Sequence, residues 1–299
     1  MAVVLGLLVA LFYGSGDFFG GLAAKRSRAS AVVIGSFAVS ALCLTVVNLG
    51  WAVVGGLPTP ADRDLALGAL AGLIGPVALG LLYRGLATGR MSVVAPITAV
   101  VAAVVPFAWG LVRGERPSTT ALGGVAIALV AVGLISGAPA HPGDLAPTAD
   151  PPSHPLAGLV PTALASGFGF GVIFILLGST SDHAGLWPLL MARPVAVAVA
   201  IGALVAWTRH RGTEVRPALL PVAGTWWKVA TTGVLDITAN GLYLAATQRG
   251  LLSIVAVLSS LYPASTVVLA RLVLGERLHR IQVLGLALAI GGVLAMAGG

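Results

Sequence analysis

The sequence predicts an all-α membrane protein in which ten transmembrane helices form two inverted five-helix repeats around a central cavity. Three observations predict this fold: a low content of charge, a series of long apolar runs, and a five-run pattern that occurs twice. Of the 299 residues, 58% are hydrophobic and only 9% are charged, whereas about 25% of an average soluble domain is charged. So few charges cannot cover a surface that faces water, and hydrocarbon must therefore surround most of the chain.

The apolar runs have the length of membrane-spanning helices. A helix needs about 20 mostly apolar residues to cross the hydrocarbon core of a bilayer, and its backbone groups must be satisfied internally. Polar or turn-forming segments separate the runs. The ten expected spans are residues 2–22, 31–54, 65–84, 91–112, 119–137, 157–178, 186–207, 225–247, 252–274 and 282–298.

The positive charge and the residue types that can bind metals do not indicate a further function. The formal net charge is +7, but the basic residues form short clusters between apolar runs, as topology signals do, so we expect no nucleic-acid partner. Cys43 is the only cysteine, and the histidines lack a metal-binding spacing. We therefore expect a multi-pass protein of the cell (inner or plasma) membrane with no metal and no cofactor. The sequence leaves its oligomeric state open.

One connection differs from the others and divides the chain. Residues 138–156 are rich in Pro, Ala and Asp and contain no Lys or Arg, a composition typical of an extended linker. This Pro-rich linker separates a first five-helix repeat, residues 1–137, from a second, residues 157–299.

The two halves share sequence segments near the end of each. Ser92–Ala95 matches Ser253–Ala256, and Gly114–Arg116 matches Gly275–Arg277, both at an offset of 161 residues. The two Gly-Glu-Arg segments each end an apolar run, and we interpret them as capped turns with a local ion pair.

The start of each half also corresponds, and the number of spans gives the relation between the halves. Leu11–Gly16 aligns with Leu164–Gly169. Because five is odd, the second copy enters the membrane from the opposite side. Inverted repeats of this kind are typical of transporters, because two such halves can alternate access to a site at the midplane.

These segments together resemble the EamA-type members of the drug/metabolite transporter superfamily. The resemblance implies a ten-helix secondary transporter with a central cavity between its halves. It covers two EamA-like units, residues 2–137 and 157–298, and it does not fix a substrate, because the superfamily transports amino acids, sugars, nucleotide-related metabolites and toxic compounds. Relatives often have Trp where this chain has Tyr13. The segments that carry the resemblance are Tyr13-Gly14-Ser15, Tyr83 to Pro96, both Gly-Glu-Arg segments, Gly250 to Ser253 and Leu261-Tyr262-Pro263.

Two acidic residues lie well inside predicted spans, and they are the first candidates for a functional site. Asp17 is in the first span, and Asp236 is at the middle of the eighth with Asn240 one turn later. Charged groups at such depth are rare and usually functional. A medium of low dielectric favours the neutral carboxyl group, so these side chains could exchange a proton or recognise a cation. The alternative is a carboxylate that only stabilises the helix bundle.

Arg193 and several aromatic residues complete the expected site. Arg193 in the seventh span either pairs with Asp236 or a substrate carboxylate, or extends towards the membrane interface. Aromatic side chains inside the spans are candidates for the cavity wall, although most aromatic residues in helices only fill space. These candidates are Tyr13, Phe18, Phe170, Tyr243 and Tyr262.

The function predicted from these patterns is secondary transport of a small metabolite, amino acid-like compound or drug by alternating access. We expect export, with proton coupling through Asp17 or Asp236, and no enzymatic activity. Two other classes stay open. A membrane-embedded enzyme would need a phosphate-binding, metal-binding or paired-carboxylate motif, and a structural membrane protein would not need an inverted repeat.

Overall fold

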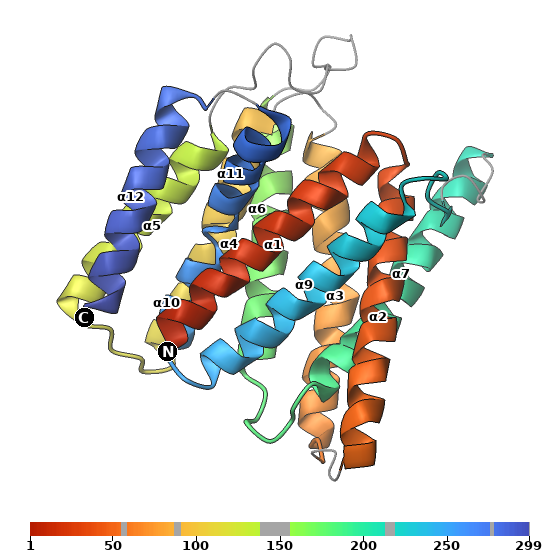
Figure 1. Ribbon diagram of the computed structural model, residues 1–299, viewed down its shortest axis with the longest axis horizontal. Helices are drawn as coiled ribbons and strands as arrows, with labels where there is room; N and C mark the ends of the chain where they lie inside the picture. The colour runs from red at the N-terminus through yellow and green to blue at the C-terminus, as the bar shows by residue number, and fades with distance from the viewer. Residues whose placement is uncertain (55–58, 87–90, 138–155, 213–218, 276–277, 299) are drawn as a thin grey trace.

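The computed structural model describes residues 1–54, 59–86, 91–137, 156–212, 219–275 and 278–298, and these residues form a bundle of α-helices without strands (Figure 1). Almost all of the expected linker, residues 138–155, lies outside the described residues. The helices are α1 (Ala2–Ala24), α2 (Ala29–Val54), α3 (Asp62–Leu86), α4 (Met91–Val112), α5 (Thr119–Ser136), α6 (Leu156–Gly178), α7 (Trp187–Arg211), α9 (Trp226–Thr247), α10 (Leu252–Ser259), α11 (Tyr262–Leu274) and α12 (Arg280–Ala297).

The predicted spans coincide with these helices, and most of the helices have the properties of membrane spans. Among the described residues, eight segments are long and apolar enough to cross a membrane, with α10 and α11 counted as one. The helix α9, which carries Lys228 and Asp236, is not among them, and the described part of α4 that qualifies as apolar is short. The chain is therefore an all-helical, multi-pass membrane protein, whereas the exact number of ten spans stays a prediction.

The ninth predicted span agrees with a candidate membrane span, Leu252–Leu274, but two helices form it instead of one. The chain breaks between α10 and α11, where Pro263 occupies the first turn of α11. A proline there needs no N–H partner, whereas its ring would clash with a carbonyl one turn earlier if the helix continued. Ser259 and Ser260 donate side-chain hydrogen bonds to the carbonyl oxygens of Val255 and Val257 at the break, and these bonds satisfy polar groups inside the apolar bundle.

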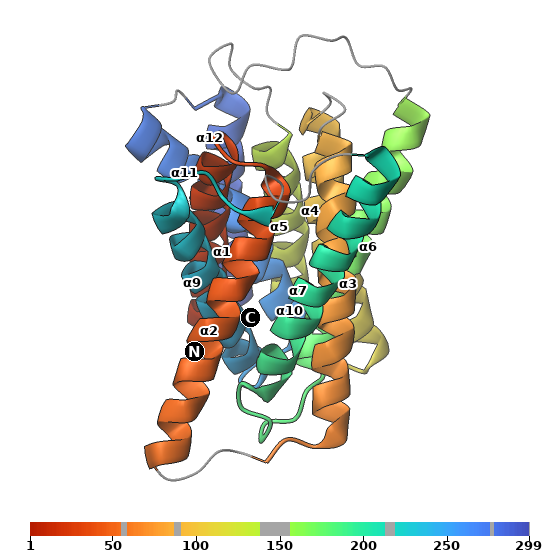
Figure 2. The same cartoon turned by 90° about the vertical axis from the view of Figure 1, so that its right-hand side faces the viewer.

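The two halves run in opposite directions and are interlocked. In Figure 1, α1 rises from the N-terminus in the lower part of the view, whereas α6 begins at the upper end and descends. The helix α1 packs against α9, α10 and α11 of the second half, and α6 packs against α3 and α4 of the first half. In the same way, α2 of the first half packs against α7 of the second, and α5 packs against α12 (Figure 2). Each half thus completes its packing only with helices of the other.

Close contacts between backbones hold α1 against α11. A side-chain carbon at Gly14 would overlap the carbonyl oxygen of Tyr262 and the side chain of Ser265. Thr266 donates a hydrogen bond of 2.9 Å to the carbonyl oxygen of Gly14. Small residues allow this approach in a membrane, where helices associate by van der Waals contact and hydrogen bonds rather than by leaving water.

The first Gly-Glu-Arg segment forms the expected capped turn, in which Gly114 has a positive φ and the Glu115 N–H group donates to the Gly110 carbonyl oxygen at 2.9 Å. Instead of the expected local ion pair, however, the Glu115 side chain makes a contact between the halves. The two carboxylate oxygens of Glu115 accept hydrogen bonds from the backbone N–H groups of Leu252 (2.8 Å) and Ser253 (2.9 Å). A carboxylate at the first turn of a helix satisfies free N–H groups and favours the helix dipole. Glu115 therefore joins the end of α4 to the start of α10. Its counterpart Glu276 lies outside the described residues.

We predict that Gly14→Ala destabilises the detergent-solubilised protein, by about 1–3 kcal/mol for an overpacked site, because the methyl group would force α1 away from α11. The control is Gly21→Ala in the same helix, where an added carbon meets nothing within 4 Å and the higher helix propensity of Ala favours folding. Thermal unfolding compares the two variants. Equal midpoints would contradict the close contact.

Candidate functional site

A cavity of about 260 Å³ lies between the two halves. Its wall is formed by α1, α2 and α3 of the first half and by α6, α7 and α9 of the second, with one residue each from α4 and α11. Ligand sites of transporters built from two repeats lie at this kind of interface. The cavity lies at this position because helices of each half pack against helices of the other.

The cavity is sealed at one end and accessible at the other. The lining residues Leu177 and Leu189 are buried, and they lie at the end of α6 and the start of α7, near the lower end of Figure 1. Asp17 and Gly21, which line the cavity in the last third of α1, are exposed. These exposures place the mouth of the cavity at the end where α1 finishes and α2 begins.

A buried carboxylate strengthens the seal at the lower end. Asp64 at the start of α3 is 1% exposed and accepts two hydrogen bonds from Ser181, from its backbone N–H at 2.9 Å and its hydroxyl group at 2.7 Å. Ser181 lies between α6 and α7, so the contact joins the two halves. Hydrogen bonds to an ionised acceptor are about twice as strong as those between neutral groups.

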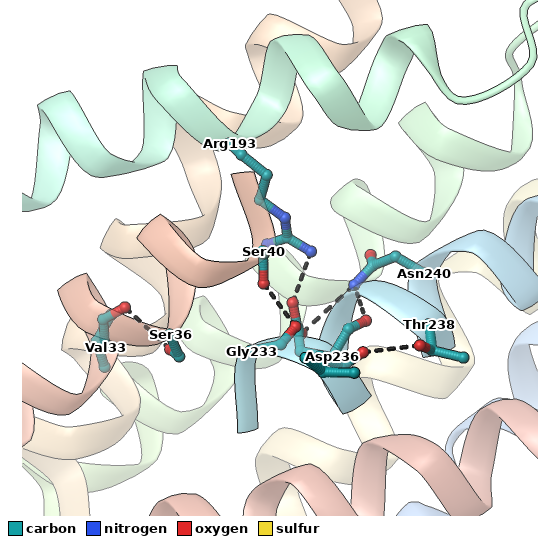
Figure 3. Close-up of polar contacts among 9 residues, drawn as sticks. Val33, Ser36, Ser40, Arg193, Gly233, Asp236, Thr238 and Asn240 are labelled. Atoms are coloured by element: carbon teal, nitrogen blue, oxygen red, sulfur yellow. Dashed lines mark hydrogen bonds and ion pairs between the residues drawn. The ribbon is translucent and has the colours of Figure 1, made fainter. Parts of the chain in front are cut away.

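An ion pair lies in the cavity wall. The guanidinium group of Arg193 on α7 is 2.6 Å from the carboxylate of Asp236 on α9 (Figure 3), and the two side chains are 10% and 28% exposed. Asn240, one turn after Asp236, donates to the Asp236 carbonyl oxygen at 2.8 Å. Ser40 on α2 donates to the carbonyl oxygen of Gly233 at 2.7 Å. Of the two alternatives that the sequence left open for Arg193, the structure has the pair with Asp236.

An aromatic ring supports the guanidinium group of this pair. The central carbon of the Arg193 guanidinium lies 5.4 Å from the centre of the Phe37 ring on α2, within the distance of a cation–π interaction. Arg193 therefore contacts a ring on one side and a carboxylate on the other. Replacing it would leave Asp236 without its counter-ion in an apolar bundle.

Asp17 has a different environment from Asp236. It faces the same cavity, but no side chain among the described residues pairs with it. Close packing brings it near α9, because a side-chain carbon at the neighbouring Gly16 would lie 3.8 Å from the backbone nitrogen of Asp236. The cavity thus holds one paired and one unpaired carboxylate. In the described part of the chain, no cluster of three or more His, Cys, Asp or Glu residues could hold a metal ion.

The structure brings most of the sequence-predicted site residues to one cavity but not all of them. Phe18 is 5% exposed and packs edge-to-face against Phe19, and Tyr243 is fully buried with its hydroxyl group donating to the Phe174 carbonyl oxygen at 3.0 Å. Neither lines the cavity. Those that do are Tyr13, Asp17, Phe170, Arg193, Asp236, Asn240 and Tyr262.

Sequence reasoning missed other parts of the site. Phe174 lies one turn after Phe170 on α6 and lines the cavity with it, so the helical period alone could have suggested it. Phe37 carried no such signal, because it lies among other apolar residues on α2. Asp64 lies just before the expected third span, outside the apolar run, so its position gave no signal that it is buried.

Comparison with known proteins gives the family. A model described as the EamA-like transporter family matches residues 1–137 and again residues 159–298. The chain belongs to this family. No curated protein matches the chain significantly. One crystal structure, described only as that of a protein, superimposes with a TM-score of 0.73 over 98% of this chain and 95% of the other at 17% identity, which shows a shared fold alone.

Membership of the EamA-like transporter family confirms the resemblance seen in the sequence. The two separate matches fit a two-repeat architecture, and the interlocked helices show how the two units contact one another. EamA-like proteins are generally transporters, so a cavity between the units is the natural place for a solute. The roles of individual residues in this cavity stay predictions.

We predict that Arg193→Met destabilises this EamA-like protein by about 3 kcal/mol, because breaking a buried pair leaves an uncompensated charge. The partial exposure of Asp236 places the effect at the low end of the usual range. The double variant Arg193→Met/Asp236→Asn should recover part of the loss, since it removes both charges. Thermal unfolding of the four proteins in detergent gives the coupling energy, and additive effects would contradict a direct pair.

Proposed function

We propose that this chain is a secondary transporter that exports a small metabolite, amino acid-like compound or drug by alternating access. The observation that carries the proposal is the cavity of about 260 Å³ between the two halves, with Asp17, Arg193 and Asp236 in its wall. Charges at this depth in a membrane protein are expensive, and they usually mark the route of a substrate or a proton.

The helix packing supports alternating access. Because α1 contacts the second half and α6 contacts the first, a movement of one half against the other changes both ends of the cavity at once. One end is sealed by Leu177, Leu189 and the Asp64–Ser181 contact, whereas Asp17 is accessible at the other. Opening the first end and closing the second would carry a bound solute across the membrane.

The two carboxylates are suited to different roles in coupling. Asp236 already has Arg193 as its counter-ion, 2.6 Å away. Asp17 has no such partner among the described side chains and faces the mouth of the cavity. An unpaired carboxylate inside a membrane protein is a typical site for binding and releasing a proton. We therefore assign proton binding to Asp17 and structural support of the site to the Arg193–Asp236 pair.

Transport is tested with purified protein in liposomes that hold a labelled panel: an amino acid, a sugar, a nucleoside and an amine. Protein-dependent flux of at least one solute supports the proposal. A membrane-embedded enzyme would form product without flux, and a structural membrane protein would do neither. Either of these results would contradict it.

We predict that Asp17→Asn abolishes solute accumulation driven by a pH gradient, because an amide cannot take up and release the coupling proton. Asp236→Asn should also lower this accumulation, through loss of the ion pair with Arg193. The matched control is Asp182→Asn, a change of the same kind at an exposed position between α6 and α7. If Asp17→Asn accumulates solute as the control does, the coupling assignment is wrong.

A further inference from the structure

The cavity has one charged side and one apolar side, because its charged residues have no charged counterparts in the other half. Leu11–Gly16 corresponds to Leu164–Gly169, so the counterpart of Asp17 is Phe170. The segments that correspond to Asp236 and Arg193, near residues 75–83 and 32–40, contain no charged residue. The charged groups therefore lie on α1, α7 and α9, and the facing helices α3 and α6 contribute only apolar side chains and glycine.

The charges that line the cavity do not balance. Among its described lining residues, the charged ones are Asp17, Arg193 and Asp236. The guanidinium group of Arg193 is 2.6 Å from Asp236 and stacks on Phe37, so these two charges neutralise each other. When Asp17 has released its proton, its carboxylate is left without a cation, and it is exposed to the cavity.

The opposite wall is shaped for an apolar group. Gly75 on α3 has open space beside it, since an added carbon would meet only the Ile173 side chain, at 3.9 Å. Phe170, Ile173 and Phe174 on α6 face the same space. The rings could also contact a cation through their faces.

We propose that the solute is an amphipathic organic cation, a primary amine whose ammonium group pairs with Asp17 and whose apolar body lies on the α3–α6 wall. This inference rests on the proposed transport function and names its substrate class. An ammonium group and a carboxylate form a charge-assisted hydrogen bond, which corrects the imbalance of charge. A carboxylate-bearing solute would need a free cation, and Arg193 is held by Asp236. At about 260 Å³, the cavity is smaller than the roughly 300–1,000 Å³ of sites for drug-sized ligands.

Four probes with a similar phenyl-bearing skeleton separate the substrate classes by charge. They are 2-phenylethylamine (a cation), phenylalanine (a zwitterion), 3-phenylpropionate (an anion) and 2-phenylethanol (neutral). Binding to the detergent-solubilised protein is measured by thermal shift and by calorimetry, because a ligand that binds only the folded state raises the unfolding temperature. We expect 2-phenylethylamine to bind at least about tenfold more tightly than the other three. Tighter binding of any other probe, or no binding of the amine, overturns the proposal.

Variants of Asp17 test where the ammonium group binds. Asp17→Asn should weaken binding of 2-phenylethylamine at least about tenfold, whereas Asp17→Glu keeps the charge and should retain most of the affinity. Asp182→Asn is the control, since Asp182 is exposed and does not line the cavity. Equal affinity in Asp17→Asn and the wild type would overturn the assignment. The unfolding temperature without ligand shows whether each variant is folded.

Variants of glycine test the apolar wall. Gly75→Val fills the space beside Ile173 and should weaken binding of 2-phenylethylamine at least about tenfold. Gly80→Val is the matched control on the same helix, because Gly80 is exposed, does not line the cavity and has nothing within 4 Å of an added carbon. Equal affinity in the two variants would contradict the position of the apolar body.

Flux measurements keep this inference separate from the proposed function. Flux of phenylalanine or 3-phenylpropionate without flux of 2-phenylethylamine would preserve transport and refute the cationic substrate. Binding of the amine at Asp17 with no flux of any probe would support the site and contradict transport. Flux of the amine that Asp17→Asn abolishes supports both.

Discussion

The insertion of the first helix of each half between the third and fourth helices of the other half is the constraint on which the rest of this structure depends. Lipid offers no hydrophobic drive for helices to associate, so α1 is held by backbone contact at Gly14 and by the hydrogen bond from Thr266. This contact sets the distance of α1 from α9, and with it the position of Asp17 beside the Arg193–Asp236 pair. The cavity exists because the two inserted helices, α1 and α6, line it from opposite sides.

The repeat also places equivalent contacts at the two ends of the protein, and their chemistry differs. At the end where α1 finishes, Ser27 shares a hydrogen bond of 2.9 Å with Thr225, which precedes α9. At the other end, Ser181 donates a hydrogen bond of 2.7 Å to Asp64, at the start of α3. The second contact is charge-assisted and therefore stronger. Sequence divergence between the halves thus stabilises the arrangement with this end sealed, while it also gives the cavity one charged and one apolar side.

The sequence predicted the spans well, because a helix that crosses a bilayer must be apolar over the thickness of the membrane, and apolar runs of this length can be recognised in the sequence. It also predicted that Asp17, Arg193 and Asp236 were unusual, since charges inside such runs are rare. It could not predict which side chains face the cavity. These helices are apolar around their whole circumference, so no polar face reveals the orientation of Phe18 or Tyr243. Contacts between distant segments, such as Glu115 with the start of α10, depend on how the halves dock, which local patterns do not record.

The central claim is that the halves move so that the seal passes from one end of the cavity to the other. Pulsed electron–electron double resonance, which measures the distance between two spin labels, tests it most directly. One pair of labels at Asp62 and Asp182 reports on the sealed end, and another pair at Arg28 and Ala223 reports on the mouth. All four positions are exposed. The labels are attached to cysteines introduced with Cys43→Ser, and the protein is studied in lipid nanodiscs with and without transported solute. The account predicts two distance populations for each pair, with the long distance at one end rising as the short distance rises at the other. A single unchanged distance at both ends in every condition would contradict it.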